Sequence, residues 1–182
     1  MSFRYEMRLS GEGGQGLVLA GKILAEAAAI YDDRNATQSQ SYGPEARGGA
    51  SKSEVIISDG EIDFPKAEQL DLLLALTQEA LDKYHDDLKE GGILLADSEH
   101  APRLPKGNWR IVQVPFISTA RDKVGRTIVA NIVALGVIVK LSGAVSEKAA
   151  EEAILARVPR GTEELNLEAY RTGLAIGEEH LG

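Results

Sequence analysis

The chain has 182 residues and a formal net charge of −8, with 26% charged and 43% hydrophobic residues. This length and composition favour a single folded domain over residues 1–182 and exclude a disordered polypeptide. The acidic balance argues against a nucleic-acid or anionic-membrane binder, which would need clustered positive charge. Cysteine is absent, so the chain can hold no disulfide, no cysteine-ligated iron–sulfur cluster and no thiol nucleophile.

The first quarter of the chain predicts a strand, a glycine-rich turn and a helix. Apolar and charged side chains alternate over residues 3–10, which is the period of a strand with one buried face. The glycine-rich stretch 11–16 follows, and small and apolar residues then recur at helical spacing over 17–28. We expect the polar stretch 31–51 to be a long loop or a weak edge strand.

The middle of the chain predicts further strands and one helix. Apolar runs indicate strands at residues 55–57, 71–77, 93–96 and 109–114. Residues 78–90 predict a helix, which we expect Gly91 and Gly92 to end. Residues 101–108 predict a loop because they include two prolines and a glycine.

The last third of the chain is predicted to be helical. Residues 127–141 indicate a buried helix, Ser146 a helix N-cap, and residues 162–180 at least one more helix. We expect Asn131, within the buried helix, to hydrogen-bond a loop backbone. Strands that alternate with helices predict an α/β fold with a mostly parallel sheet, helices on both faces and a helical C-terminal third.

Signals for targeting, membrane insertion and metal binding are weak throughout the sequence. The first residues lack the apolar core of a signal peptide, and the apolar stretch 128–139 is shorter than the roughly 20 residues that span a bilayer. We therefore expect a cytoplasmic protein. The histidines are too scattered for a zinc site, and we expect His85 on a solvated helix face and His100 and His180 without partners. No metal site and no catalytic residue is predicted.

The glycine-rich turn is the first candidate site. Gly11, Gly13 and Gly16 satisfy G-x-G-x-x-G between a predicted strand and a helix, which lets backbone N–H groups approach an anion. The candidate anion or ligand loop comprises Gly11, Glu12, Gly13, Gly14, Gln15 and Gly16. A dinucleotide site would also need an acidic residue ending a second strand about 20 positions on, but Asp32 and Asp33 follow a helical segment. The alternative is that the glycines only allow close packing of strand and helix.

The second candidate site lies in the polar stretch that follows. Tyr42 can pack and hydrogen-bond at once, and Arg47 offers a fork of donors for a carboxylate or a phosphate. We expect a partner or ligand contact through Tyr42, Gly43, Pro44, Glu45, Arg47, Gly48 and Gly49. The alternative is a solvated turn in which Arg47 lies in water.

Taken in order, these motifs resemble the gamma subunit of 2-oxoacid:ferredoxin oxidoreductases of the pyruvate, 2-oxoglutarate or 2-oxoisovalerate type. The chain is also similar to the small subunit of indolepyruvate oxidoreductases and to the equivalent domain of single-chain pyruvate:ferredoxin oxidoreductases. The resemblance spans about Arg4 to Gly177 and rests on residues 11–16, 21–24 and 41–49, Asn131, and the pair Leu135-Gly136.

The resemblance implies a subunit of an enzyme that oxidatively decarboxylates a 2-oxoacid to an acyl-coenzyme A and reduces ferredoxin. It implies thiamine diphosphate, iron–sulfur clusters and coenzyme A in the whole complex, none of them bound by this chain alone. The implied partners are alpha, beta and ferredoxin-like delta subunits, with ferredoxin as an indirect partner. The chain would shape or cover the active site and be inactive alone.

Several expectations about assembly remain open. When isolated, the chain is expected to form a homodimer, because a surface that normally faces partners would be left uncovered. We expect the two glycine-rich segments to lie side by side, with a partner subunit slightly favoured over coenzyme A as the group that they contact. The alternatives are a stand-alone nucleotide-dependent enzyme with a Rossmann-like fold and a pure assembly module.

Overall fold

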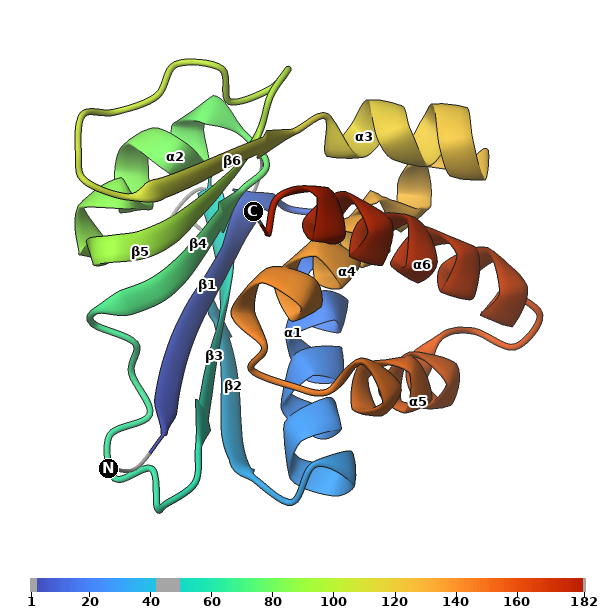
Figure 1. Ribbon diagram of the computed structural model, residues 1–182, viewed down its shortest axis with the longest axis horizontal. Helices are drawn as coiled ribbons and strands as arrows, with labels where there is room; N and C mark the ends of the chain where they lie inside the picture. The colour runs from blue at the N-terminus through green and yellow to red at the C-terminus, as the bar shows by residue number, and fades with distance from the viewer. Residues whose placement is uncertain (1–2, 42–49, 182) are drawn as a thin grey trace.

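A computed structural model describes residues 3–41 and 50–181. Its strands are β1 Arg4–Glu12, β2 Asn35–Ser41, β3 Ala50–Ser58, β4 Leu70–Ala75, β5 Leu88–Asp97 and β6 Arg110–Val114. They form one sheet in the order β2-β3-β1-β4-β5-β6 (Figure 1). Strand β3 pairs antiparallel with β1 and β2, whereas the pairs β1-β4, β4-β5 and β5-β6 are parallel. The predicted mostly parallel sheet is confirmed.

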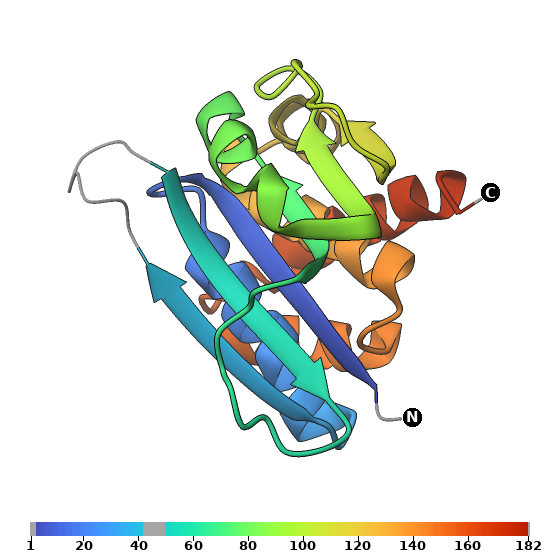
Figure 2. The ribbon, with the colours of Figure 1, turned by 90° about the vertical axis from the view of Figure 1, so that its left-hand side faces the viewer.

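Helices pack on both faces of this sheet, as predicted. They are α1 Leu17–Glu26, α2 Gln78–Tyr84, α3 Phe116–Thr119, α4 Ala130–Ser142, α5 Glu147–Arg157 and α6 Glu163–Glu179. A π-helical turn, Ala27–Tyr31, continues α1, and a second one, Ala120–Val124, continues α3. Helices α1, α4, α5 and α6 form a thick layer on one face, and α2 lies on the other with the connection 59–69 (Figures 1 and 2).

The buried residues form one apolar core on each face of the sheet. Met7 and Leu9 of β1 contribute to the core beneath α1 and α4, whereas Leu73 of β4 packs with Leu81 of α2 on the other face. Helix α4 is buried almost all round, as the uninterrupted apolar composition of residues 127–141 predicts. It crosses α6 where Gly136 lies against Gly173, and a Cβ on either glycine would collide with backbone atoms of the other helix.

Strand β1 is buried on both faces, so the predicted single buried face is wrong. Arg8 is only 3% exposed, because it lies beneath α2 inside a set of polar partners. Its Nε and Nη2 atoms donate to Oε2 of Glu54 at 2.9 and 2.7 Å, and its Nη1 donates to Oδ2 of Asp87 at 2.5 Å. The guanidinium also lies 5.0 Å from the centre of the Tyr84 ring. We call these four residues the Arg8 cluster.

The starts of two predicted strands and the end of one predicted helix are corrected. The strand predicted at 55–57 begins at Ala50, because its polar first half pairs with both β1 and β2. The stretch 31–51 contains the edge strand β2, as one of the two expectations had it. The helix predicted over 78–90 ends at Tyr84, followed by a 3-10 turn at His85–Asp87. Gly91 and Gly92 lie inside β5 because the strand begins at Leu88, which pairs with Leu70 of β4.

All three histidine expectations need correction, and one capping prediction is confirmed. His180 was expected without a partner, but its Nδ1 lies 2.9 Å from the carbonyl oxygen of Ile176. The His85 ring is half-buried and meets the Trp109 ring edge-on, with 6.0 Å between ring centres, so it is not on a solvated face. His100 Nδ1 lies 3.0 Å from Oδ1 of the buried Asp97, which also accepts the backbone N–H groups of the same turn. The Ser146 hydroxyl caps α5, accepting the N–H of Ala149 at 3.1 Å.

Among the described residues, no helix is long and apolar enough to cross a membrane.

Candidate functional site

The glycine-rich turn lies where β1 ends and α1 begins, at the edge of the sheet where open α/β folds place their ligands. Gly11 and Glu12 still belong to β1, so the turn itself comprises residues 13–16. Gly14 has φ +89° and Gly16 φ +77°, in the left-handed region that favours glycine. The predicted order of strand, turn and helix is confirmed.

The side chain of Gln15 holds the turn against the end of β1. Its Oε1 accepts the backbone N–H of Glu12 at 2.7 Å. A Cβ on Gly11 would collide with this same oxygen, so Gly11 makes the room in which Gln15 folds back. Gly11 and Gln15 therefore shape the turn and are engaged within the chain.

Asn131 of α4 fixes the other end of the turn. Its Nδ2 donates to the carbonyl oxygen of Gly16 at 3.0 Å, as the sequence predicts for this buried amide. A Cβ on Gly16 would collide with that Nδ2 atom. Asn131 is 5% exposed, so the bond joins two elements across the core and fixes where α1 starts.

Gly13 and Gly14 differ from Gly11 and Gly16, the other two glycines of the motif, because they face open space. A Cβ built on either residue would meet no atom of the described chain within 4 Å. Helix α1 starts beside them without a side-chain cap and without an acidic residue in its first turn. The N–H groups and the positive end of the helix dipole are thus presented to the outside, which favours an anion.

A cavity of about 350 Å³ opens beside this turn. Helices α1, α4, α6 and the segments before α4 and α6 contribute its lining: Gly14, Gly16, Leu19, Arg126, Ile128, Val129, Asn131, Val158, Pro159, Thr162, Leu165 and Asn166. Most of these side chains are apolar, and Ile128 is 71% exposed. Arg126 is the one charged residue in the lining. The cavity therefore joins an apolar wall to a cation and an open helix N-terminus.

The sequence motifs do not indicate this cavity, because its walls come from segments more than a hundred residues apart. Five of the six strands, β2 to β6, lie between the turn and Arg126 in the sequence, and the packing of α4 brings Arg126 close to the turn. The one available signal is Asn131, whose buried amide needs a partner and finds it in Gly16. Pairing a buried amide in the sequence with a possible backbone partner can indicate that residues 126–131 pack against residues 13–16. It cannot indicate that a cavity lies between these two segments.

The second candidate site, Tyr42 to Gly49, lies outside the described residues. The described ends of the strands on either side show its neighbourhood. Ala50, the first residue of β3, pairs with Glu12, and the next residue pairs with Gly11. The start of β3 therefore lies directly beside the glycine-rich turn.

Within the described ranges, the structure holds no group of three or more His, Asp or Glu side chains arranged to bind a metal ion.

Replacing Asn131 by alanine is expected to lower the free energy of unfolding by about 1–3 kcal/mol, because the Gly16 carbonyl loses its donor in a buried position. Urea denaturation measures the loss. Asn166→Ala is the matched control, since Asn166 lines the same cavity but bonds Thr162 of its own segment. A loss of similar size in both variants would show that truncation of the cavity wall, and not the bond to Gly16, causes the destabilisation.

Comparison with known proteins gives consistent matches over nearly the whole chain. The family model for pyruvate ferredoxin/flavodoxin oxidoreductases matches residues 6–176. The 2-oxoglutarate synthase subunit KorC of Methanocaldococcus jannaschii is 51% identical over 181 residues, which cover 98% of this chain and 97% of that subunit. The crystal structure of a keto/oxoacid ferredoxin oxidoreductase gamma subunit from Geobacter sulfurreducens PCA has a TM-score of 0.91 and 59% identity, covering 98% of each chain.

A more distant solved structure shares the fold alone. It is the 2-oxoglutarate:ferredoxin oxidoreductase from Magnetococcus marinus, with 2-oxoglutarate, coenzyme A and succinyl-CoA bound. It has a TM-score of 0.84 and 22% identity, and the match covers 97% of this chain and 31% of that one. The same arrangement of elements therefore also occurs as one part of a longer chain.

Proposed function

Since this chain belongs to the pyruvate ferredoxin/flavodoxin oxidoreductase family, as a gamma subunit of a 2-oxoacid:ferredoxin oxidoreductase, we propose that its glycine-rich turn and the adjoining cavity hold coenzyme A. The observation that carries this proposal is the open side of Gly13 and Gly14 next to the cavity. Coenzyme A combines phosphates with an adenine ring and a pantetheine arm. The helix N-terminus and Arg126 suit the phosphates, and the apolar wall suits the less polar parts.

A carboxylate of a partner subunit is the alternative that the sequence favours for this turn. Such a carboxylate would satisfy the helix N-terminus and Arg126, but it would leave the apolar part of the cavity without a matching group. The Ile128 side chain is largely exposed, and such exposed apolar surface argues for a contact with a group larger than one carboxylate. The cavity thus supports coenzyme A over a partner side chain.

The rest of the reaction is proposed to lie on other subunits. We propose 2-oxoglutarate as the oxoacid, because the KorC relative belongs to a 2-oxoglutarate synthase. This chain has no cysteine, so ligands for iron–sulfur clusters have to come from elsewhere. Alpha, beta and ferredoxin-like delta subunits are the proposed partners, with thiamine diphosphate on other subunits and ferredoxin as electron acceptor. The cytoplasmic location and the homodimer of the isolated chain stay predictions, the latter tested by light scattering.

The isolated chain is expected to show no oxoacid-dependent reduction of a viologen dye in the presence of coenzyme A. The reason is that the redox centres and the thiamine site are proposed to lie on other subunits. The assay compares the purified chain with the assembled complex at equal concentration. Turnover by the chain alone would contradict the proposed division of labour.

Binding of coenzyme A to the isolated chain is the direct test of the proposed site. Isothermal titration calorimetry should show binding to the unmodified chain, and Arg126→Gln should weaken it about tenfold, which is about 1.4 kcal/mol. Arg103→Gln is the matched control, since Arg103 is an exposed arginine on the loop after β5. If coenzyme A does not bind and Arg126→Gln instead impairs assembly of the complex, the turn contacts a partner subunit.

A further inference from the structure

Strand β2 forms an edge of the sheet that lacks the usual protection. It pairs with β3 without interruption, from Asn35 opposite Ser58 to Ser41 opposite Lys52. Its residues, Asn-Ala-Thr-Gln-Ser-Gln-Ser, include no lysine, no proline and no other charged side chain. Edge strands that stay unpaired usually carry such residues, because a free row of N–H and C=O groups is a template for another strand. Among the described residues, no strand pairs with the outer side of β2.

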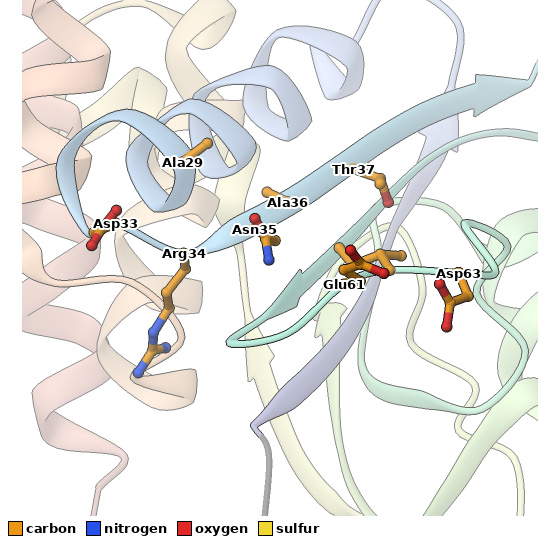
Figure 3. A pocket seen from close by; sticks show the side chains of 9 residues that line it. Ala29, Asp33, Arg34, Asn35, Ala36, Thr37, Glu61 and Asp63 are labelled. Atoms are coloured by element: carbon orange, nitrogen blue, oxygen red, sulfur yellow. The ribbon is translucent and has the colours of Figure 1, made fainter.

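A groove runs along the first half of this free edge. It has a volume of about 570 Å³ and is lined by Ala29, Asp33, Arg34, Asn35, Ala36, Thr37, Glu61, Ile62 and Asp63. Figure 3 shows the helical turn that carries Ala29 on one side of β2 and the segment of Glu61 and Asp63 on the other. Consecutive residues of β2 and of the turn before it form the floor, so the groove follows the backbone. This shape suits a second extended chain.

The charges around the groove indicate what kind of chain fits. Asp33, Glu61 and Asp63 are exposed. Arg34 is engaged elsewhere, since its Nε lies 3.3 Å from Oδ1 of Asp59 and its guanidinium stacks 4.2 Å from the centre of the Phe3 ring. The three carboxylates therefore leave the groove with an excess of negative charge, which attracts lysine or arginine side chains.

A second copy of this chain fits the groove less well. In an antiparallel pairing of two β2 strands, the groove of one copy would face Gln40 and Ser41 of the other, which carry no charge. Among the described residues, no positive side chain of the second copy would face the carboxylates, and two chains of net charge −8 would be brought together. We propose that the free edge of β2 is a docking site for an extended, positively charged segment of another chain of the complex, which adds to the sheet as a seventh strand.

Amide hydrogen exchange tests whether this edge is covered in the assembled enzyme. We expect the amides of Asn35–Ser41 to exchange at least tenfold more slowly in the purified complex than in the isolated chain, because half of them gain a strand partner. Equal exchange in the two states would overturn the proposal. Slow exchange already in the isolated chain, together with a dimer in light scattering, would assign the edge to a second copy and would also overturn it.

Charge reversal tests the chemistry of the segment. Glu61→Lys combined with Asp63→Lys is expected to weaken assembly of the complex at least tenfold at low salt, and less at high salt because the attraction is screened. The matched control is Glu152→Lys with Glu179→Lys, two exposed glutamates on α5 and α6 that lie outside the groove. Equal weakening by both double variants would show a general effect of net charge and would overturn the assignment. This test is independent of coenzyme A, so it can fail while the proposed function stands.

Discussion

Replacement of Arg8 by alanine is expected to lower the free energy of unfolding by about 3–5 kcal/mol, the typical loss when one partner of a buried ion pair is removed. The guanidinium is only 3% exposed and bonds both Glu54 and Asp87, and Glu54 is itself 6% exposed. Without Arg8, the Glu54 carboxylate would lie beneath α2 with Lys52, 3.6 Å away, as its one remaining ion-pair partner among the described residues. Desolvation of that carboxylate is the main part of the expected loss.

Urea denaturation followed by circular dichroism measures this loss, and two further variants separate its causes. Arg121→Ala removes an exposed arginine that pairs with Asp122 in solvent, and it should leave the denaturation midpoint unchanged. Arg8→Met combined with Glu54→Leu removes both buried charges and should recover much of the stability lost in Arg8→Ala. If Arg8→Ala and the double variant lose the same free energy, the Arg8 cluster acts through packing and not through charge.

The Arg8 cluster also shows why part of the fold could not be read from the sequence. Strict alternation over residues 3–10 predicts that Arg8 faces solvent, and it does lie on the face opposite Met7 and Leu9. What alternation cannot indicate is that α2 and the connection 59–69 cover that face as well (Figure 2). The period of a strand specifies the two faces, whereas the burial of each face depends on segments far along the chain.

Helix ends were predictable only where local capping decides them. Ser146 caps α5 as predicted, because the bond from the Ala149 N–H involves neighbouring residues. The end of α2 depends on tertiary contacts instead, because Leu88 pairs with Leu70 and draws residues 88–90 into β5. Gly91 and Gly92 were expected to end a helix, but they sit in an irregular part of a strand, where the register between β4 and β5 shifts.

Part of the candidate site was also predictable from the sequence, and part of it was not. The glycine-rich turn, its place before a helix and the family to which the chain belongs were all predictable, because they depend on residues close together in sequence. The cavity beside the turn was not, since Arg126 and Ile128 reach it only through the packing of α4. Single residues such as these carry no motif of their own. The sequence alone therefore predicts a ligand-binding turn, whereas the residues that would contact the ligand beside the turn are identified only from the structure.

Gly14→Val is expected to lower kcat/KM for coenzyme A in the assembled complex at least tenfold, while the variant chain still folds. A valine Cβ on Gly14 meets no atom of the described chain, so the fold has room for it. The branched side chain would stand over the open N–H groups of the turn and exclude a phosphate from them. The positive φ of +89° adds a backbone cost of about 1–2 kcal/mol, which stability measurements should register.

Gly91→Val provides the control that separates this backbone cost from the blocked site. Gly91 has φ +80° and equally open space around its Cβ position, but it lies in the first half of β5, at the opposite end of the parallel strands from the glycine-rich turn. Both variants should lose similar free energy of unfolding in urea, and only Gly14→Val should lose coenzyme A-dependent turnover. Equal turnover in the two variants would show that the open side of the glycine-rich turn is not used. A Gly14→Val chain that folds but fails to join the complex would show that the open side of the glycine-rich turn contacts a partner subunit. In that case the valine side chain would block the partner and not coenzyme A.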